Sequence, residues 1–140
     1  MIQREVDAGR INRVANSNGV RDGVCYHDAR MDWSAAFPPH QTGIIVLSDG
    51  QDACGVFAMT ADRVWQVHTL FGAACRGRQA IEAGRGMIEW MRPHADIIWG
   101  ATPVRNCAAR WFNRQLGAMP IRREIYEAEG EVEVFELRLN

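Results

Sequence analysis

The sequence contains no lysine, because all 16 of its basic residues are arginine. This absence excludes mechanisms that depend on lysine, such as a Schiff base with a carbonyl substrate or a P-loop phosphate site. The formal net charge of −1 also argues against a protein that binds nucleic acid through an excess of positive charge. We therefore expect partners other than nucleic acid.

Long apolar runs and metal-ligand patterns are missing as well. No stretch approaches the roughly 18 apolar residues that span a membrane, and the first residues do not resemble a secretion signal. The cysteines form no C-x-x-C pair, and no two histidines have zinc-ligand spacing. We predict a cytoplasmic protein with no membrane segment and no metal. Its thiols should be reduced and mostly packed, and they are Cys25, Cys54, Cys75 and Cys107.

The remaining composition is that of one globular domain. Hydrophobic residues make up 47% and charged residues 24% of 140 residues, which is enough to build a sizeable core. No internal repeat, low-complexity segment or break in composition divides the chain. A single domain over residues 1–140 is therefore predicted.

The middle of the chain predicts an antiparallel meander. Three segments rich in β-branched and aromatic residues are separated by short turn sequences, which leave no room for crossover helices. The first forty residues are less regular, and we expect only a short strand at Ile2–Val6 and a short helix at Arg10–Asn16 before a long loop. The three expected meander strands are Gly43–Leu47, Ala53–Met59 and Val64–Phe71.

The apolar period then changes to that of a helix over Arg76–Met91, which Pro93 ends. Asp96–Ala101 is a continuous apolar run and predicts a central strand buried on both faces. Thr102 and Pro103 predict the N-cap and first turn of a second helix, which would end before Gly117.

Two further strands are expected at Ile121–Glu127 and Val132–Leu139, and a slip in the apolar alternation of the second predicts a bulge. The order of elements predicts an α/β protein with a mixed sheet. Six or seven mostly antiparallel strands would be flanked by helices, with one parallel crossover unit.

Two of these segments resemble the motifs of GNAT N-acyltransferases. A strand, a short loop and a helix start match the family's pattern R/Q-x-x-G-x-G/A, and the second helix resembles the family's later asparagine motif. The likeness spans residues 43–139, and the sequence of this region is similar to that of GNAT-like proteins of phages and prophages. The residues that carry it are Val67–Phe71, Cys75–Ile81, Asn106, Ala109, Phe112 and Leu116–Ala118.

The resemblance implies a GNAT fold with acetyl-CoA or coenzyme A as co-substrate. The pyrophosphate would bind at the start of the first long helix, and the pantetheine arm would contact the end of the preceding strand. Asn106 would contact the cofactor or cap the second helix. Gln79 and Ile81 depart from the family's small residues. The implied cofactor residues are Leu70, Phe71, Arg76, Gly77, Arg78, Gln79, Ala80 and Asn106.

For catalysis the family needs a base, and His68 is the candidate because it lies near the end of the cofactor strand. A half-buried structural histidine is the alternative, and His27, Asp32 and Glu124 are further candidates. The family often places a tyrosine four residues before the motif glycine as an acid. Asn113 stands there and has no titratable proton.

Two functions are therefore carried forward. The first is an N-acyltransferase that moves an acetyl or other acyl group from CoA to a primary amine of a small molecule or peptide. The second is a catalytically weak or inactive GNAT-fold module, such as a phage or prophage component. The acceptor is not predicted, and a homodimer is one of the assemblies considered.

Overall fold

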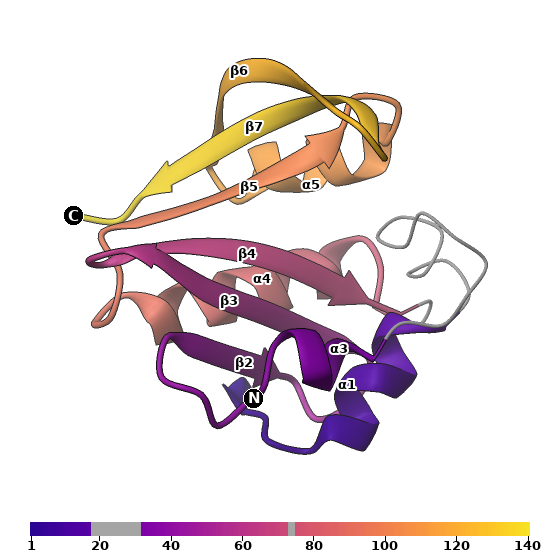
Figure 1. Cartoon of the computed structure of the whole chain (residues 1–140), viewed down its shortest axis with the longest axis vertical. Coiled ribbons are helices and arrows are strands. Elements are labelled where there is room, and N and C mark those ends of the chain that lie inside the picture. Colours follow the sequence, from indigo (N-terminus) through magenta and orange to yellow (C-terminus); the bar gives the residue numbers. More distant parts are fainter. Residues whose placement is uncertain (18–31, 73–74) are drawn as a thin grey trace.

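The computed structural model describes residues 1–17, 32–72 and 75–140. Within them the strands form one seven-stranded mixed sheet in the order β1-β2-β3-β4-β5-β7-β6 (Figure 1). None of the described helices has the length and apolar character needed to cross a membrane. The elements are β1 Gln3–Arg4, α1 Ala8–Ala15, α3 Trp33–Ala36, β2 Ile44–Ser48, β3 Ala53–Ala61, β4 Val64–Phe71, α4 Arg78–Met91, β5 Ile97–Pro103, α5 Cys107–Gln115, β6 Met119–Tyr126 and β7 Gly130–Arg138.

The predicted meander is confirmed. β2, β3 and β4 pair antiparallel as neighbours, and α4 then carries the chain back so that β5 starts parallel to β4. The predicted β4 and the observed β4 have the same bounds. The mixed α/β sheet expected from the order of elements is therefore the architecture of the chain.

The helices form two layers, one on each face of the sheet. In Figure 1, α1 and α3 lie in front of the sheet, and α4 and α5 lie behind it. Two cores follow from the alternation of side chains along the strands. The front core contains Val46, Val56 and Leu70, whereas the rear core contains Leu47 and Phe57.

α4 packs against α5 at very short range. It buries Ala80, Gly84, Met87 and Met91, which belong to the apolar face predicted for it. A Cβ added to Gly84 would lie 2.9 Å from a methyl carbon of Leu116 and 3.0 Å from the Phe112 ring. The missing side chain at Gly84 therefore allows the two helices to approach each other behind the sheet.

The boundary between β5 and α5 was predicted wrongly. Thr102 and Pro103 do not begin the helix, because they still pair with Glu133 and Val132 of β7. The N-cap is Asn106. The prediction that this strand is buried on both faces is also wrong, since buried and partly exposed residues alternate along it. Pairing with β7 keeps β5 inside the sheet without covering its second face.

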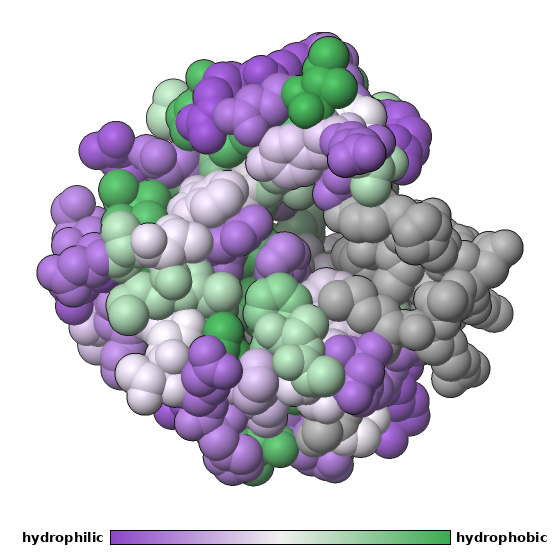
Figure 2. Space-filling model, viewed as in Figure 1, coloured by the Kyte–Doolittle hydropathy of each residue, from purple (hydrophilic) through white to green (hydrophobic). Residues whose placement is uncertain are grey.

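The predicted bulge lies between the last two strands, but the extra residue belongs to β6. Pro120 pairs with Phe135 and Arg122 pairs with Val134, so that Ile121 has no opposite residue. The apolar phase of β7 slips at the same place. β6 is the edge of the sheet, and Figure 2 shows mostly hydrophilic residues over the β6–β7 hairpin, broken by a few hydrophobic ones.

The thiols differ from one another in their surroundings. Cys54 and Cys75 are buried, as predicted, and burial raises the pKa of the Cys54 thiol to about 11. Cys107, expected to be packed, is exposed because it occupies the first turn of α5 on its solvent side. Cys25 lies outside the described residues.

Candidate functional site

β4 and β5 separate after a short parallel contact. They pair only from Val64 with Ile97 to Gln66 with Trp99, although β4 continues to Phe71 and β5 continues to Pro103. Figure 1 shows the two strands diverging toward their carboxyl ends. The sheet is thus open between two neighbouring strands.

The backbone of β4 faces this opening at every second residue. A Cβ added to Gly100 of β5 would lie 3.2 Å from the carbonyl oxygen of Val67, so this carbonyl faces β5. Consecutive strand residues direct their N–H and C=O groups to alternate edges, which places those of Thr69 and Phe71 on the same side. Beyond the pair of Gln66 with Trp99, β5 no longer lies opposite this edge of β4, so the N–H groups of Thr69 and Phe71 have no strand with which to pair.

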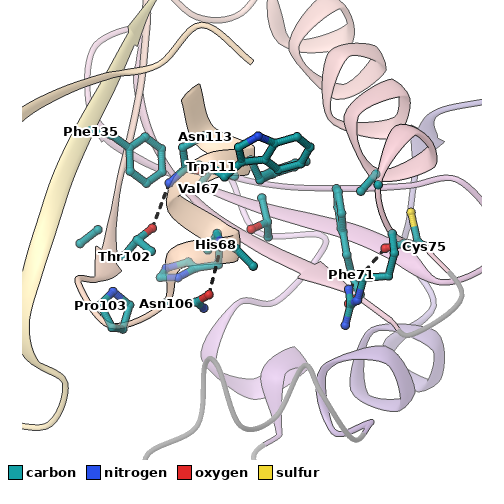
Figure 3. Close-up of a pocket in the computed structure, with 18 residues that line it drawn as sticks. Val67, His68, Phe71, Cys75, Thr102, Pro103, Asn106, Trp111, Asn113 and Phe135 are labelled. Atoms are coloured by element: carbon teal, nitrogen blue, oxygen red, sulfur yellow. Dashed lines mark hydrogen bonds between the residues drawn. The ribbon is translucent and has the colours of Figure 1, made fainter. Parts of the chain in front are cut away.

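The separated strands enclose a cleft of about 350 Å³. Its walls come from β4, from β5, from the start of α4, from α5 and from one side chain of β7 (Figure 3). The lining residues are Val67, His68, Thr69, Phe71, Cys75, Arg76, Gly77, Ala80, Ala101, Thr102, Pro103, Asn106, Ala108, Ala109, Trp111, Phe112, Asn113 and Phe135.

The N-terminus of α4 borders the cleft without a side-chain cap. Its N-cap residue is Gly77, with φ 57° and ψ −127°, a conformation open mainly to glycine. Arg76 folds back, and its Nη1 donates to the carbonyl of Phe71 at 2.7 Å and to that of Cys75 at 3.3 Å. Amides of the first helical turn and an arginine charge therefore stand beside the end of β4, an arrangement that favours an anion.

The N-terminus of α5 borders the cleft from the opposite side. Asn106 caps it, since its Oδ1 accepts a hydrogen bond from the amide of Ala109 at 3.1 Å. Further along α5, the buried side chain of Asn113 donates from Nδ2 to the hydroxyl of Thr102 on β5, at 3.0 Å. Figure 3 shows this pair at the β5 wall of the cleft.

His68 lines the cleft from β4, with its side chain on the front of the sheet. Its ring is 5.1 Å from that of Phe37 and 5.7 Å from that of Trp33, measured between centroids. Burial against these rings lowers the pKa of His68 below its usual 6.5, since it disfavours the charged form. The imidazole is therefore neutral at pH 7 and able to accept a proton.

The structure brings together most of the residues selected from the sequence. His68, Phe71, Arg76, Gly77, Ala80 and Asn106 line the cleft. Leu70 does not, because its side chain is fully buried in the front core. Arg78 is exposed on α4, and Gln79 lines a separate hollow beside Asp52, behind the helix start.

The other candidates for a base lie away from the cleft lining. Asp32 caps α3, where hydrogen bonds from Ser34 and Asn12 lower its pKa. Glu124 pairs with Arg122 on the exposed strand β6. His27 lies outside the described residues.

Several cleft residues were not selected from the sequence. Val67 and Thr69 precede and follow the selected His68, and the edge that their backbone faces depends on the register with β5. Thr102 and Phe135 reach the cleft from β5 and β7 through pairing between distant segments. Trp111 of α5 also lines the cleft, where it is half exposed.

Comparisons with known proteins agree at the level of the fold. No protein-family model and no curated protein sequence matches the chain. Solved structures do. An aminoglycoside acetyltransferase in complex with ribostamycin and coenzyme A has a TM-score of 0.79 at 12% identity, over 99% of this chain and 92% of that one.

Two further acetyltransferases show the same likeness. A GNAT-family enzyme from Streptococcus pneumoniae has a TM-score of 0.67 at 16% identity, over 100% of this chain and 99% of that one. A variant of spermidine N-acetyltransferase from Vibrio cholerae has a TM-score of 0.75 at 10% identity, over 99% and 95%. None of these bears on the narrower likeness to phage proteins, which stays a prediction. The chain has the fold of the GNAT N-acyltransferases.

Proposed function

We propose that the chain is an N-acyltransferase that moves an acetyl or other short acyl group from coenzyme A to a primary amine. The observation that carries the proposal is the separation of β4 and β5 into a cleft flanked by two helix N-termini. Similarly folded structures contain coenzyme A or acetyl-CoA, which fits a cleft of this kind. A cytoplasmic location and a small-molecule or peptide acceptor are part of the proposal and rest on the sequence.

The start of α4 suits the pyrophosphate of the cofactor. Its first-turn amides have no side-chain cap, and the helix dipole favours a negative group there. Arg76 is exposed and Arg78 follows it in the first turn, so both guanidinium groups can approach an anion. Gln79 lies on the other side of the helix start, where its bulk does not enter the cleft.

The open edge of β4 suits the pantetheine arm and the thioester. The N–H groups of Thr69 and Phe71 face the cleft beyond the last pair of the ladder, and one of them can donate to the thioester oxygen. That donor would stabilise the negative charge as the amine nitrogen attacks the carbonyl carbon. The N–C bond forms, the C–S bond breaks, and coenzyme A leaves as a thiolate.

His68 is proposed as the group that removes the proton from the amine, directly or through one water. Its neutral form predominates at pH 7 because burial lowers its pKa. Asn113 has no proton to give to the thiolate, and its amide is engaged with Thr102. Water is therefore proposed to protonate the leaving group.

The second candidate is a module that binds coenzyme A, or a related group, without turning it over. The Asn113 side chain favours it, because this buried amide stands where an acid would be expected. Binding separates neither candidate from the other, so turnover must be measured as well. The distinction is made by incubating the protein with acetyl-CoA and a panel of primary amines and measuring the free thiol of coenzyme A that acyl transfer releases.

The first test is the melting temperature with coenzyme A and acetyl-CoA. At a hundred times its dissociation constant, a ligand adds about 2.7 kcal/mol to the free energy of unfolding. The double variant Arg76→Glu and Arg78→Glu should abolish this gain. A control that reverses two exposed arginines of β6 and β7, Arg123→Glu with Arg138→Glu, should keep it. Unchanged melting of the parent chain at millimolar acetyl-CoA contradicts the proposal.

A further inference from the structure

A second, smaller cavity lies behind the cleft, between the sheet and the helices α4 and α5. Its volume is about 40 Å³. The cleft and this cavity share part of their walls, so the cavity continues the cleft toward the rear core. The shared residues are Val67, Thr69, Phe112, Asn113 and Phe135.

The lining of this rear cavity is apolar. Thr69 and Asn113 are the only polar side chains among the described residues that line it, and the amide of Asn113 is turned to Thr102. No charged side chain takes part in the described lining. A phosphate, an ammonium group or the amide-rich pantetheine arm would lose hydration there without finding a partner. A short hydrocarbon chain would not.

We infer that the rear cavity receives the acyl group of the donor, and that the protein therefore prefers butyryl-CoA to acetyl-CoA. This inference rests on the proposed function, because it places a thioester in the cleft. A cavity needs roughly 10–15 Å³ to hold one water-sized group, so 40 Å³ has room for about three. The single methyl group of an acetyl thioester would leave most of this apolar space empty.

The position of the cavity also keeps the acyl chain apart from the acceptor. Phe57 and Met87, which line the cavity, belong to the rear core beneath α4. His68 points to the opposite face of the sheet, against Trp33 and Phe37. The amine can therefore approach the carbonyl carbon from the front of the sheet while the acyl group occupies the cavity behind it.

The test is calorimetric binding of coenzyme A, acetyl-CoA, butyryl-CoA and hexanoyl-CoA to the parent chain. Two additional buried methylene groups should tighten binding of butyryl-CoA over acetyl-CoA about tenfold. Equal or weaker binding of butyryl-CoA, with acetyl-CoA and coenzyme A still bound, overturns the inference and leaves the proposed function standing. If no thioester and no coenzyme A binds, the proposed function fails and the inference with it.

Two variants test whether the acyl group of the donor occupies the cavity. Ala118 and Leu137 line the cavity but not the cleft. Ala118→Leu fills part of the cavity and should remove the tenfold preference while acetyl-CoA binds as before. Leu137→Ala enlarges the cavity and should move the preference to hexanoyl-CoA.

Leu139→Ala is the matched control, because Leu139 packs on the same rear core without lining the cavity. It should keep the parent's preference for butyryl-CoA. If Ala118→Leu does not fold, Leu137→Ala and its control decide alone. An identical ratio of butyryl to acetyl affinity in Leu137→Ala, Leu139→Ala and the parent contradicts the assignment.

Discussion

The Asn113 side chain donates a hydrogen bond to the hydroxyl of Thr102 at 3.0 Å, and both residues are 7% exposed. The bond joins α5 to β5 beside the cleft, on the strand that has separated from β4. Because a buried amide without a partner is costly, this contact fixes how α5 sits on the sheet. The position that lacks the expected acid therefore has a structural role.

Thr102→Val should test this role, since valine keeps the shape of threonine and removes the hydroxyl. We expect the free energy of unfolding to fall by about 1–3 kcal/mol, because the buried Asn113 amide loses its acceptor. Urea denaturation measures the loss. In the double variant with Asn113→Leu the second substitution should add little, and fully additive losses would show that the two groups do not interact.

The sequence was informative where one pattern dominates a segment. β4 and α4 were predicted closely, because β-branched alternation and a helical apolar face are local signals. The order of these elements and the glycine-containing helix start led to the right fold. Local signals also misled, since Thr102 and Pro103 are good helix starters that pairing with β7 keeps in a strand.

The cleft itself could not be predicted from local patterns. It exists because pairing between β4 and β5 stops at Gln66 and Trp99, and pairing is a relation between distant segments. The same register decides that Thr69, rather than Leu70, faces the opening. Phe135 completes the wall from β7, and its ring would lie 2.6 Å from a Cβ at Gly100. Such contacts follow from the assembled sheet.

Gly77→Ala tests the conformation of the helix start. Gly77 has φ 57°, and an added Cβ would meet no atom within 4 Å, so the cost is backbone strain alone. We expect a loss of about 1–3 kcal/mol in the free energy of unfolding, together with weaker binding of coenzyme A. Gly130→Ala in the β6–β7 turn is the control, with φ 74° and equally open space. It should destabilise the chain without affecting coenzyme A, and equal affinity in both variants would argue against the phosphate site.

A buried carboxylate fixes the other side of α5. Glu133 is 5% exposed, and it lies 3.2 Å from Arg110 and 3.6 Å from the more exposed Arg114. Arg110 also donates to the carbonyl of Val104 at 3.2 Å. Arg110→Met should therefore cost about 1–3 kcal/mol, because it leaves the buried carboxylate with only the longer contact of Arg114.

Arg114→Met should cost at most about 1 kcal/mol, as expected for a long contact of a half-exposed arginine. Thermal or urea unfolding of the two variants gives the comparison. Equal losses in the free energy of unfolding would mean that the two arginines stabilise the Glu133 carboxylate to the same extent.

The last prediction concerns His68, whose pKa is lowered by burial. Well above pH 6.5 the imidazole is neutral in the folded and the unfolded chain, so it gives no pH dependence there. As the pH falls through 6.5, the unfolded chain binds a proton that the folded chain does not, and the free energy of unfolding decreases until the pH has passed the folded pKa. His68→Gln should remove this decrease, which urea unfolding at a series of pH values between 8 and about 5 measures.

The same shift predicts the rate profile if His68 is the base. Acyl transfer at saturating donor should rise with pH through a midpoint below 6.5, because the neutral imidazole must accept the proton. His68→Gln should slow transfer by about 10²-fold or more and lose this midpoint. A variant that loses the pH-dependent stability but turns over as fast as the parent would assign His68 to the front core alone. The two measurements thus separate a buried structural histidine from a catalytic one, since burial produces the first effect and only proton transfer produces the second.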